Sequence, residues 1–185
     1  QEIYDFYSKK IGRGKCELIH HFLTYFPPTK SNLYGDYLVF AGRLSPEKGL
    51  TDMVEVFNLI HKKDPKLHLK IVGDGPEKSK LQEQTKRLKL GNSVELLGNR
   101  DSAFVSKTLE GASLYLLTSF SESFGLAPLE AMSFGVPVVA FDTARGALDF
   151  LVDKKNSSII KTRNINAMAN SVISYFFTYK RSILI

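Results

Sequence analysis

The sequence predicts an α/β fold: a doubly wound, mostly parallel sheet with helices on both faces, as in a Rossmann-like domain. From residue 37 onward, short apolar runs alternate with amphipathic stretches long enough to be helices. Several of the short runs are apolar throughout, which is typical of strands covered on both faces. Because each helix joins two strands, the connections are crossovers, and crossovers build an open parallel sheet.

Strands and helices are expected to alternate between residues 37 and 109. The first strand is an unbroken apolar run, YLVFA, and the helix after it repeats apolar residues at helical spacing until Asp64-Pro65 ends it. The expected elements are a strand at 37–41, a helix from Leu50 to Ile60, a strand at 67–72, a charged helix at 77–90, a strand at 94–97 and a short helix at 102–109 capped by Ser102.

The second half continues the alternation. Gly135 stops one helix, and the last helix carries its apolar side chains on a single face. The expected elements are a strand at 114–117, a helix at 126–134, a strand at 136–141, a short helix near Leu148, a strand at 158–161 and a final helix from Asn164.

The first 36 residues are less regular than the rest. Residues 2–9 suit a helix, 16–22 a strand that could join the sheet edge, and 25–31 a loop. We therefore divide the chain into an interdomain linker with a candidate first strand, residues 1–36, and one Rossmann-like domain, residues 37–185. A start at Gln1 rather than Met suggests a piece of a longer chain.

The amino-acid composition limits the classes of binding partner that the chain could have. Lys and Arg total 25 and Asp and Glu 19, giving a net charge of +6 at pH 7, which suits a nucleotide, a nucleic acid or an acidic membrane face. The basic helix at 77–90 also contains glutamates and lacks the interleaved aromatic residues of a single-strand binder, so we expect no nucleic-acid partner. No apolar run reaches the roughly 18 residues that span a bilayer.

A single cysteine, Cys16, excludes an internal disulfide and a cysteine-based zinc site. A lone thiol suits a reducing compartment, so the cytoplasm is expected. His20 and His21 have no partner at metal-ligand spacing, and no metal site is predicted.

Ligands of open parallel sheets bind beyond the carboxyl ends of the strands, so the loops there are the first candidates. After the first strand, Gly42 and Gly49 enclose a loop in which Arg43 and Lys48 could reach an anion beside a helix N-terminus. The alternative is a solvated loop whose cations face water. The next loop, GDGP at 73–76, lacks the third glycine of the dinucleotide fingerprint, so we interpret it as a tight turn and disfavour a nicotinamide cofactor.

The richest segment lies between residues 118 and 132. Glu122 precedes a helix, where a carboxylate is often only a partner of the helix dipole. Glu130 lies among apolar neighbours inside the helix, and an ionised carboxylate there requires hydrogen-bond donors, which the vicinal hydroxyls of a ribose would supply. The backbone N–H groups of residues 124–126 would face a phosphate or a sugar.

These segments follow one another in an order that resembles a known family. They are FAGRL at 40–44 with EKG at 47–49, IVGDGP at 71–76, VELLG at 94–98, SFSESFGLAPLEAM at 119–132 and GVPVV at 135–139. Over about residues 37–177 they resemble the C-terminal, donor-binding half of the retaining glycosyltransferases of the GT-B fold, called family 4 or group 1.

The resemblance implies roles for single residues. Arg43 and Lys48 match the basic pair on the donor diphosphate, with Gly42 beside them. Glu122 matches a partner of the sugar hydroxyls, Phe124, Gly125 and Leu126 match the backbone donors to sugar and phosphate, and Glu130 matches the ribose-binding glutamate. The implied catalytic residues are Arg43, Lys48 and Glu122, which would assist departure of the diphosphate without a metal.

The implied activity is transfer of a hexose from a nucleotide sugar, with a UDP-hexose as the favoured donor, in glycan or glycolipid synthesis. The family's N-terminal domain carries the acceptor site, so we expect this chain to be inactive or incomplete without it. Two alternatives stay open: half of a nucleotide-sugar 2-epimerase, or a non-catalytic nucleotide-sugar-binding subunit. The full enzyme is expected in the cytoplasm, with peripheral association at the inner face of the membrane.

Overall fold

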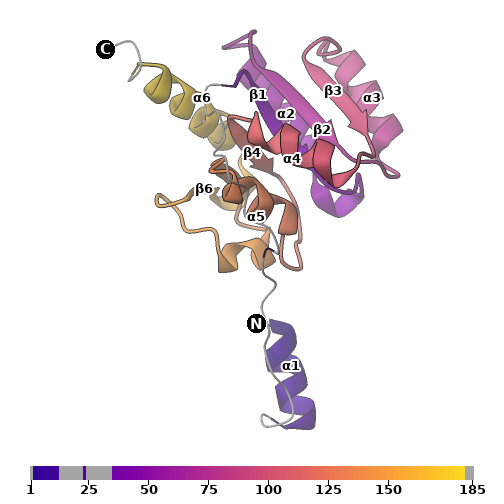
Figure 1. Cartoon of the computed structure of the whole chain (residues 1–185), viewed down its shortest axis with the longest axis vertical. Coiled ribbons are helices and arrows are strands. Elements are labelled where there is room, and N and C mark those ends of the chain that lie inside the picture. Colours follow the sequence, from indigo (N-terminus) through magenta and orange to yellow (C-terminus); the bar gives the residue numbers. More distant parts are fainter. Residues whose placement is uncertain (1, 13–22, 24–34, 182–185) are drawn as a thin grey trace.

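The computed structural model describes residues 2–12, 23 and 35–181, and it confirms the predicted α/β class. Within these residues the strands are β1 (Tyr37–Ala41), β2 (His68–Val72), β3 (Val94–Gly98), β4 (Leu114–Leu117), β5 (Val138–Phe141) and β6 (Ser157–Ile160). They form one sheet in the order β3-β2-β1-β4-β5-β6, in which every neighbouring pair is parallel (Figure 1). This is the strand order of a Rossmann fold.

Helices cover both faces of this sheet. On one side α2 packs against α3 and α6, and α4 packs against α5 in a second group (Figure 1). The helices are α1 (Glu2–Ile11), α2 (Leu50–His61), α3 (Lys78–Arg87), α4 (Ser102–Glu110), α5 (Leu126–Ser133) and α6 (Ile165–Arg181), with short 3-10 turns η2 (Pro46–Lys48), η3 (Arg145–Asp149) and η4 (Lys161–Arg163). None of the helices described is both long and apolar enough to cross a membrane.

The core lies around the central strands. All residues of β4 and β5 are buried, as the unbroken apolar runs predicted. Tyr115 of β4 is the one residue there with a polar side-chain group, and its hydroxyl donates a 2.9 Å hydrogen bond to the carbonyl oxygen of Ala41 at the end of β1. Because a buried hydroxyl requires a partner, this bond fixes the ends of β1 and β4 against each other.

The order of the sheet reverses between β1 and β4. From β1 the chain proceeds outward to β2 and β3, and α4 then carries it back across to β4, on the other side of β1. Loops leaving the carboxyl ends of β1 and β4 therefore separate in opposite directions. A crevice at this position is the usual ligand site of open α/β sheets.

Several expected boundaries were wrong. Asp101, not Ser102, caps α4, since its Oδ1 accepts a 2.8 Å hydrogen bond from the N–H of Phe104. The strand expected at 136–141 begins at Val138, because Pro137 has no N–H to donate to a neighbouring strand. The strand expected at 158–161 spans 157–160, and the helix expected at 77–90 spans 78–87.

The N-terminal helix expected at 2–9 is present as α1. The strand expected at 16–22, the loop expected at 25–31 and the pair His20-His21 lie outside the described residues.

Candidate functional site

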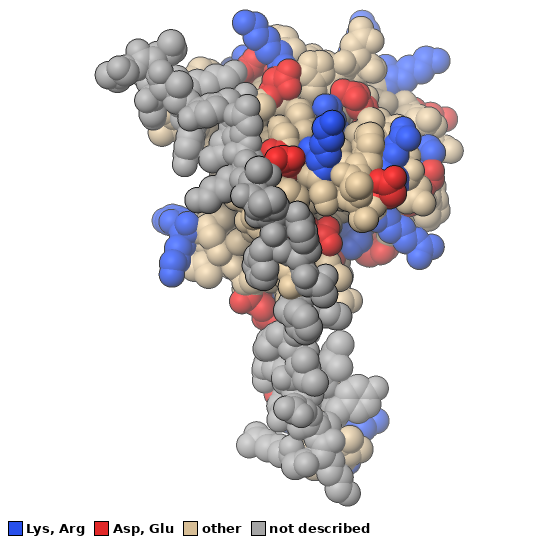
Figure 2. Space-filling model, viewed as in Figure 1, with Lys and Arg blue, Asp and Glu red and all other residues tan. Residues whose placement is uncertain are grey.

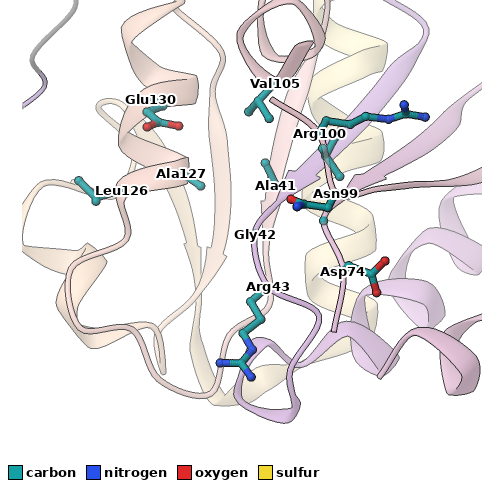
Figure 3. Close-up of a pocket in the computed structure, with 12 residues that line it drawn as sticks. Ala41, Gly42, Arg43, Asp74, Asn99, Arg100, Val105, Leu126, Ala127 and Glu130 are labelled. Atoms are coloured by element: carbon teal, nitrogen blue, oxygen red, sulfur yellow. The ribbon is translucent and has the colours of Figure 1, made fainter. Parts of the chain in front are cut away.

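A cavity of about 590 Å³ opens at the carboxyl edge of the sheet, where the strand order reverses. This volume suits a small-molecule ligand. Figure 3 shows Glu130 on one wall, Asn99 and Arg100 on the opposite wall, and Gly42 and Arg43 between them. The lining residues are Ala41, Gly42, Arg43, Val72, Gly73, Asp74, Asn99, Arg100, Val105, Leu126, Ala127 and Glu130.

Arg43 is placed by two loops that run side by side. The N–H of Gly42 donates to the carbonyl oxygen of Val72, and that of Leu44 to the carbonyl oxygen of Asp74, at 3.0 and 2.9 Å. Within the described part of the chain the exposed guanidinium of Arg43 has no hydrogen-bond or ion-pair partner. It is therefore available to an anionic ligand.

Glu130 projects from α5 into the cavity and is only partly exposed. Its carboxylate has no hydrogen-bond or ion-pair partner among the residues described, and burial raises the pKa of this carboxyl above its ordinary value. A partly desolvated, unpaired carboxylate favours a ligand that supplies hydrogen-bond donors.

The N-terminus of α5 has no side-chain cap. Gly125 precedes the helix in the left-handed region (φ 88°), and the N–H groups of the first turn are directed away from the helix body. Leu126 lines the cavity. Phe124 and Gly125 do not line it: the ring of Phe124 packs against Phe150, with centroids 5.4 Å apart, and Gly125 is buried.

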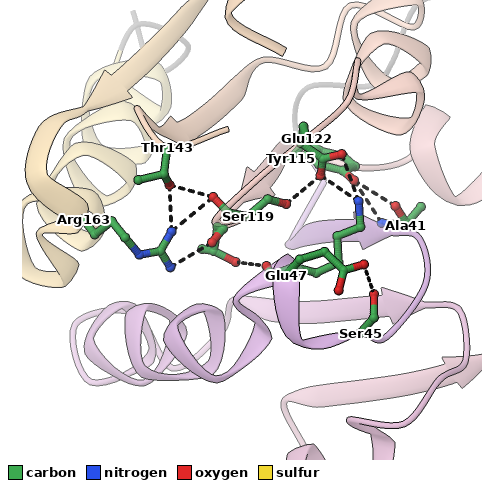
Figure 4. Close-up of polar contacts among 10 residues, drawn as sticks. Ala41, Ser45, Glu47, Tyr115, Ser119, Glu122, Thr143 and Arg163 are labelled. Atoms are coloured by element: carbon green, nitrogen blue, oxygen red, sulfur yellow. Dashed lines mark hydrogen bonds and ion pairs between the residues drawn. The ribbon is translucent and has the colours of Figure 1, made fainter. Parts of the chain in front are cut away.

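Lys48 and Glu122 form an ion pair beside this cavity rather than lining it. The Nζ of Lys48 lies 2.9 Å from each carboxylate oxygen of Glu122 (Figure 4). The hydroxyl of Ser119 donates a 2.6 Å hydrogen bond to Oε1 of the same carboxylate. The Lys48 and Glu122 side chains are only 20% and 9% exposed. Two residues with separately predicted roles are thus joined directly.

The buried hydroxyl of Tyr115 has a raised pKa. Burial raises the pKa of its hydroxyl, and the carboxylates of Glu122 and Glu130 raise it further. This hydroxyl bonds to the carbonyl oxygen of Ala41 at the end of β1.

The wall opposite Glu130 was missed by the sequence analysis. Asn99 and Arg100 follow β3, and Asp74 follows β2, where it pairs with Lys78 at 2.6 Å. The guanidinium of Arg100 lies 4.9 Å above the ring of Phe104 and donates to the carbonyl oxygen of Leu97. The signal was available, since all three residues lie within three positions of the end of a predicted strand.

Charges of both signs are mixed on one face of the molecule. On the face shown in Figure 2, Lys and Arg side chains alternate with Asp and Glu, so the described residues there form no broad patch of one sign. His, Cys, Asp and Glu side chains of the described residues form no cluster of three or more that could hold a metal ion.

The sequence profile of the family named Glycosyl transferases group 1 matches residues 24–178. The chain belongs to the group 1 glycosyltransferases. The resemblance drawn from the five motif segments is confirmed.

Relatives of this glycosyltransferase chain are longer proteins. The GtfA subunit of a UDP-N-acetylglucosamine–peptide N-acetylglucosaminyltransferase from Streptococcus parasanguinis is 32% identical over 150 residues, which are 77% of this chain and 29% of that protein. A poly(glycerol-phosphate) alpha-glucosyltransferase from Bacillus subtilis is 36% identical over 139 residues, 74% of this chain and 20% of that protein. The chain thus spans less than a third of either relative.

A solved structure agrees with the fold. A TarM mutant from S. aureus, crystallised with fondaparinux, alpha-GlcNAc-glycerol and UDP, matches 83% of this chain with a TM-score of 0.75 and 32% identity. The match covers 30% of the TarM chain.

Proposed function

We propose that this chain binds the nucleotide-sugar donor of a retaining hexosyltransferase, with a UDP-hexose as the donor. The observation that carries the proposal is the partly buried carboxylate of Glu130, which faces a cavity with the cation of Arg43 at its base, both unpaired among the residues that the structure describes. The two hydroxyls of a ribose can donate hydrogen bonds to the carboxylate of Glu130, and a diphosphate is the anion that suits Arg43.

The remaining cavity residues support one orientation of the donor. With the ribose at Glu130, the base lies against Asn99 and Arg100, where an amide can both donate to and accept from a base edge. The diphosphate then extends toward Arg43 and the uncapped first turn of α5, whose N–H groups favour an anion.

The hexose is assigned to the Lys48–Glu122 pair. A lysine ammonium has three N–H donors, and two of them are directed at the carboxylate oxygens of Glu122. The third is left for a phosphate oxygen, while Glu122 accepts from a sugar hydroxyl. When the bond between the anomeric carbon and the diphosphate oxygen breaks, Arg43 and Lys48 stabilise the charge that develops on the diphosphate, so the proposal requires no metal ion.

The proposal includes a second domain or subunit that carries the acceptor site. Both relatives are several times longer than the matched segment, which supports an acceptor site on another domain. One relative is named as a subunit, so a role as a donor-binding subunit of an assembly is the second candidate. A cytoplasmic location, with the complete enzyme at the inner membrane face, remains part of the proposal.

Calorimetry on the 185-residue chain tests the donor assignment. UDP, GDP and ADP are titrated into the wild type, Arg43→Ala and Glu130→Gln, with Lys161→Ala as a control that removes an exposed cation outside the cavity. We expect UDP to bind most tightly and both site variants to weaken it at least roughly tenfold, or ~1.4 kcal/mol. Absence of binding at millimolar nucleotide, or equal affinity of the wild type and Glu130→Gln, would contradict the proposal.

A further inference from the structure

We propose that Arg163 is a positioning residue for the sugar-diphosphate end of the site: it fixes the segment after β4 that carries Ser119 and, through it, the Lys48–Glu122 pair. This inference rests on the proposed donor function. Arg163 does not line the cavity and lies outside every motif used to recognise the family.

The guanidinium of Arg163 joins three separate parts of the chain, and Figure 4 shows its bonds to the segments after β4 and β5. After β4, it donates to the carbonyl oxygens of Thr118 and Ser119 at 2.9 and 3.1 Å. After β5, it donates to the hydroxyl of Thr143 at 2.8 Å, and it also forms an ion pair with Asp52 in the first turn of α2. One planar fork of donors thus holds the carboxyl ends of β4 and β5 and the start of α2 together.

Aromatic contacts hold the same guanidinium in place. Its central carbon lies 3.6 Å from the centroid of the Phe120 ring and 4.6 Å from that of Phe141. The Arg163 side chain is only 16% exposed, although it is charged. Stacking on the ring of Phe120 adds a constraint on the residue that lies between Ser119 and Glu122 in this loop.

The backbone at Arg163 is strained. Thr162 and Arg163 both have positive φ values, 58° and 48°, in the left-handed region that residues with a Cβ rarely occupy. Such a conformation persists only when surrounding contacts determine it. The contacts present are those of the guanidinium and a hydrogen bond from the N–H of Thr162 to Oδ2 of Asp142 at 3.4 Å. With this backbone conformation, the side chain of Arg163, which follows β6, extends past β5 and reaches the carboxyl end of β4.

Ser119 transmits the constraint to the reacting end of the site. Its carbonyl oxygen accepts from Arg163 and from the hydroxyl of Thr143, and its own hydroxyl donates to Glu122 at 2.6 Å. Glu122 in turn holds Lys48. The adjacent N–H of Phe120 donates to the carbonyl oxygen of Glu47 at 2.7 Å, which ties the same loop to η2. Loss of Arg163 should therefore disturb Lys48 and Glu122 without touching Glu130.

The test is whether loss of Arg163 weakens binding of a sugar nucleotide more than binding of the nucleoside alone. NMR titrations with uridine and with UDP-N-acetylglucosamine compare the wild type, Arg163→Ala, Arg163→Lys and the control Lys161→Ala, which removes an exposed cation of the same 3-10 turn. We expect Arg163→Ala to weaken UDP-N-acetylglucosamine at least about tenfold and uridine less than about twofold. Arg163→Lys should remain weak, because a point charge cannot reproduce the fork, and Lys161→Ala should match the wild type.

Hydrogen exchange gives a second measurement that needs no nucleotide. The N–H groups of Phe120 and Gly146 donate to Glu47 and Glu122 carbonyls, and both should exchange faster in Arg163→Ala than in Lys161→Ala. If Arg163→Ala does not fold, Thr143→Val, which removes one hydroxyl of the network, should produce a smaller change in the same direction.

Two results for Arg163→Ala overturn the inference. One is equal weakening of uridine and UDP-N-acetylglucosamine binding. The other is that both the UDP-N-acetylglucosamine affinity and the exchange rate at Phe120 stay unchanged. If the wild type binds neither ligand, the proposed function fails. Unchanged exchange at Phe120 then overturns the positioning role separately.

Discussion

The ammonium of Lys48 lies 2.9 Å from both carboxylate oxygens of Glu122, although the two residues are 74 positions apart in the sequence. The pair is mostly buried, so each charge depends on the other for compensation. Lys48 is therefore a different kind of cation from Arg43, which is exposed and unpaired within the described structure. Arg43 is available to a ligand directly, whereas Lys48 also maintains the loop that holds Glu122.

Breaking this ion pair should cost stability as well as ligand affinity. Lys48→Met leaves the carboxylate of Glu122, 9% exposed, without its cation, and we expect a loss of about 2 kcal/mol in the free energy of unfolding. The double variant Lys48→Met/Glu122→Gln removes both charges and should be more stable than the sum of the single effects by ~1 kcal/mol or more. Urea denaturation measures each value, and additivity within about 0.5 kcal/mol would show that the pair contributes no coupling.

Glu130→Gln should raise stability at neutral pH while weakening UDP binding. Burial raises the pKa of Glu130 in the folded chain, so the folded state holds this proton to a higher pH than the unfolded state does. Wild-type stability therefore falls as pH rises from the unfolded value, about 4.3, through the raised folded value. Gln cannot ionise and avoids that loss, but it forfeits charge-assisted hydrogen bonds to the ribose worth about 1.5–3 kcal/mol.

Thermal melts between pH 4 and pH 8 measure this effect. The difference in melting temperature between Glu130→Gln and the wild type should be smallest in acid and should widen as pH rises. Glu83→Gln, on the exposed side of α3, serves as a matched control and should show no such widening. A difference independent of pH would show that ionisation of Glu130 is not its source.

The local pattern was enough to predict most elements and one side of the cavity. Apolar runs located each of the described strands to within about two residues, and the segments that follow β1 and β4 contain Arg43, Leu126 and Glu130, which line the cavity. The turn after β2, which contains Asp74, was interpreted only as a tight turn, and the loop after β3, with Asn99 and Arg100, was not considered. They were missed because single polar residues after a strand have no motif of their own.

Contacts between distant segments could not be predicted. Lys48 meets Glu122 because β1 lies beside β4, and adjacency of strands is set by packing of the whole sheet, not by periodicity. Arg163 is harder still, since nothing in KTR at 161–163 indicates a left-handed backbone or a side chain that reaches across β5. The contact between the rings of Phe124 and Phe150 could not be predicted either, since the motif gave a role only to the backbone N–H of Phe124.

The start of α4 offers a comparison between two adjacent residues. Asp101→Ala removes the oxygen that accepts from the N–H of Phe104 and should cost about 1 kcal/mol of stability. Ser102→Ala lies inside the first turn, where alanine is the better helix former, and should change stability by less than about 0.5 kcal/mol. Urea denaturation of both variants measures the difference, and equal losses would contradict the assignment of Asp101 as the cap.

Gly73→Ala should damage both the fold and the cavity, because Gly73 lies where the loops after β1 and β2 touch. A Cβ at this position would lie 1.9 Å from the carbonyl oxygen of Gly42, and the backbone there has a φ of 136°. The loop bearing Gly42 and Arg43 would have to move away, so we expect a loss of at least about 2 kcal/mol, a fall in melting temperature of roughly 4–8 °C and weaker UDP binding. Gly91→Ala is the matched control, since a Cβ at Gly91 meets no atom within 4 Å, and it should melt near the wild type. If Gly73→Ala binds UDP with wild-type affinity, the position of Arg43 does not depend on this contact, and the base of the cavity is set by β1 alone.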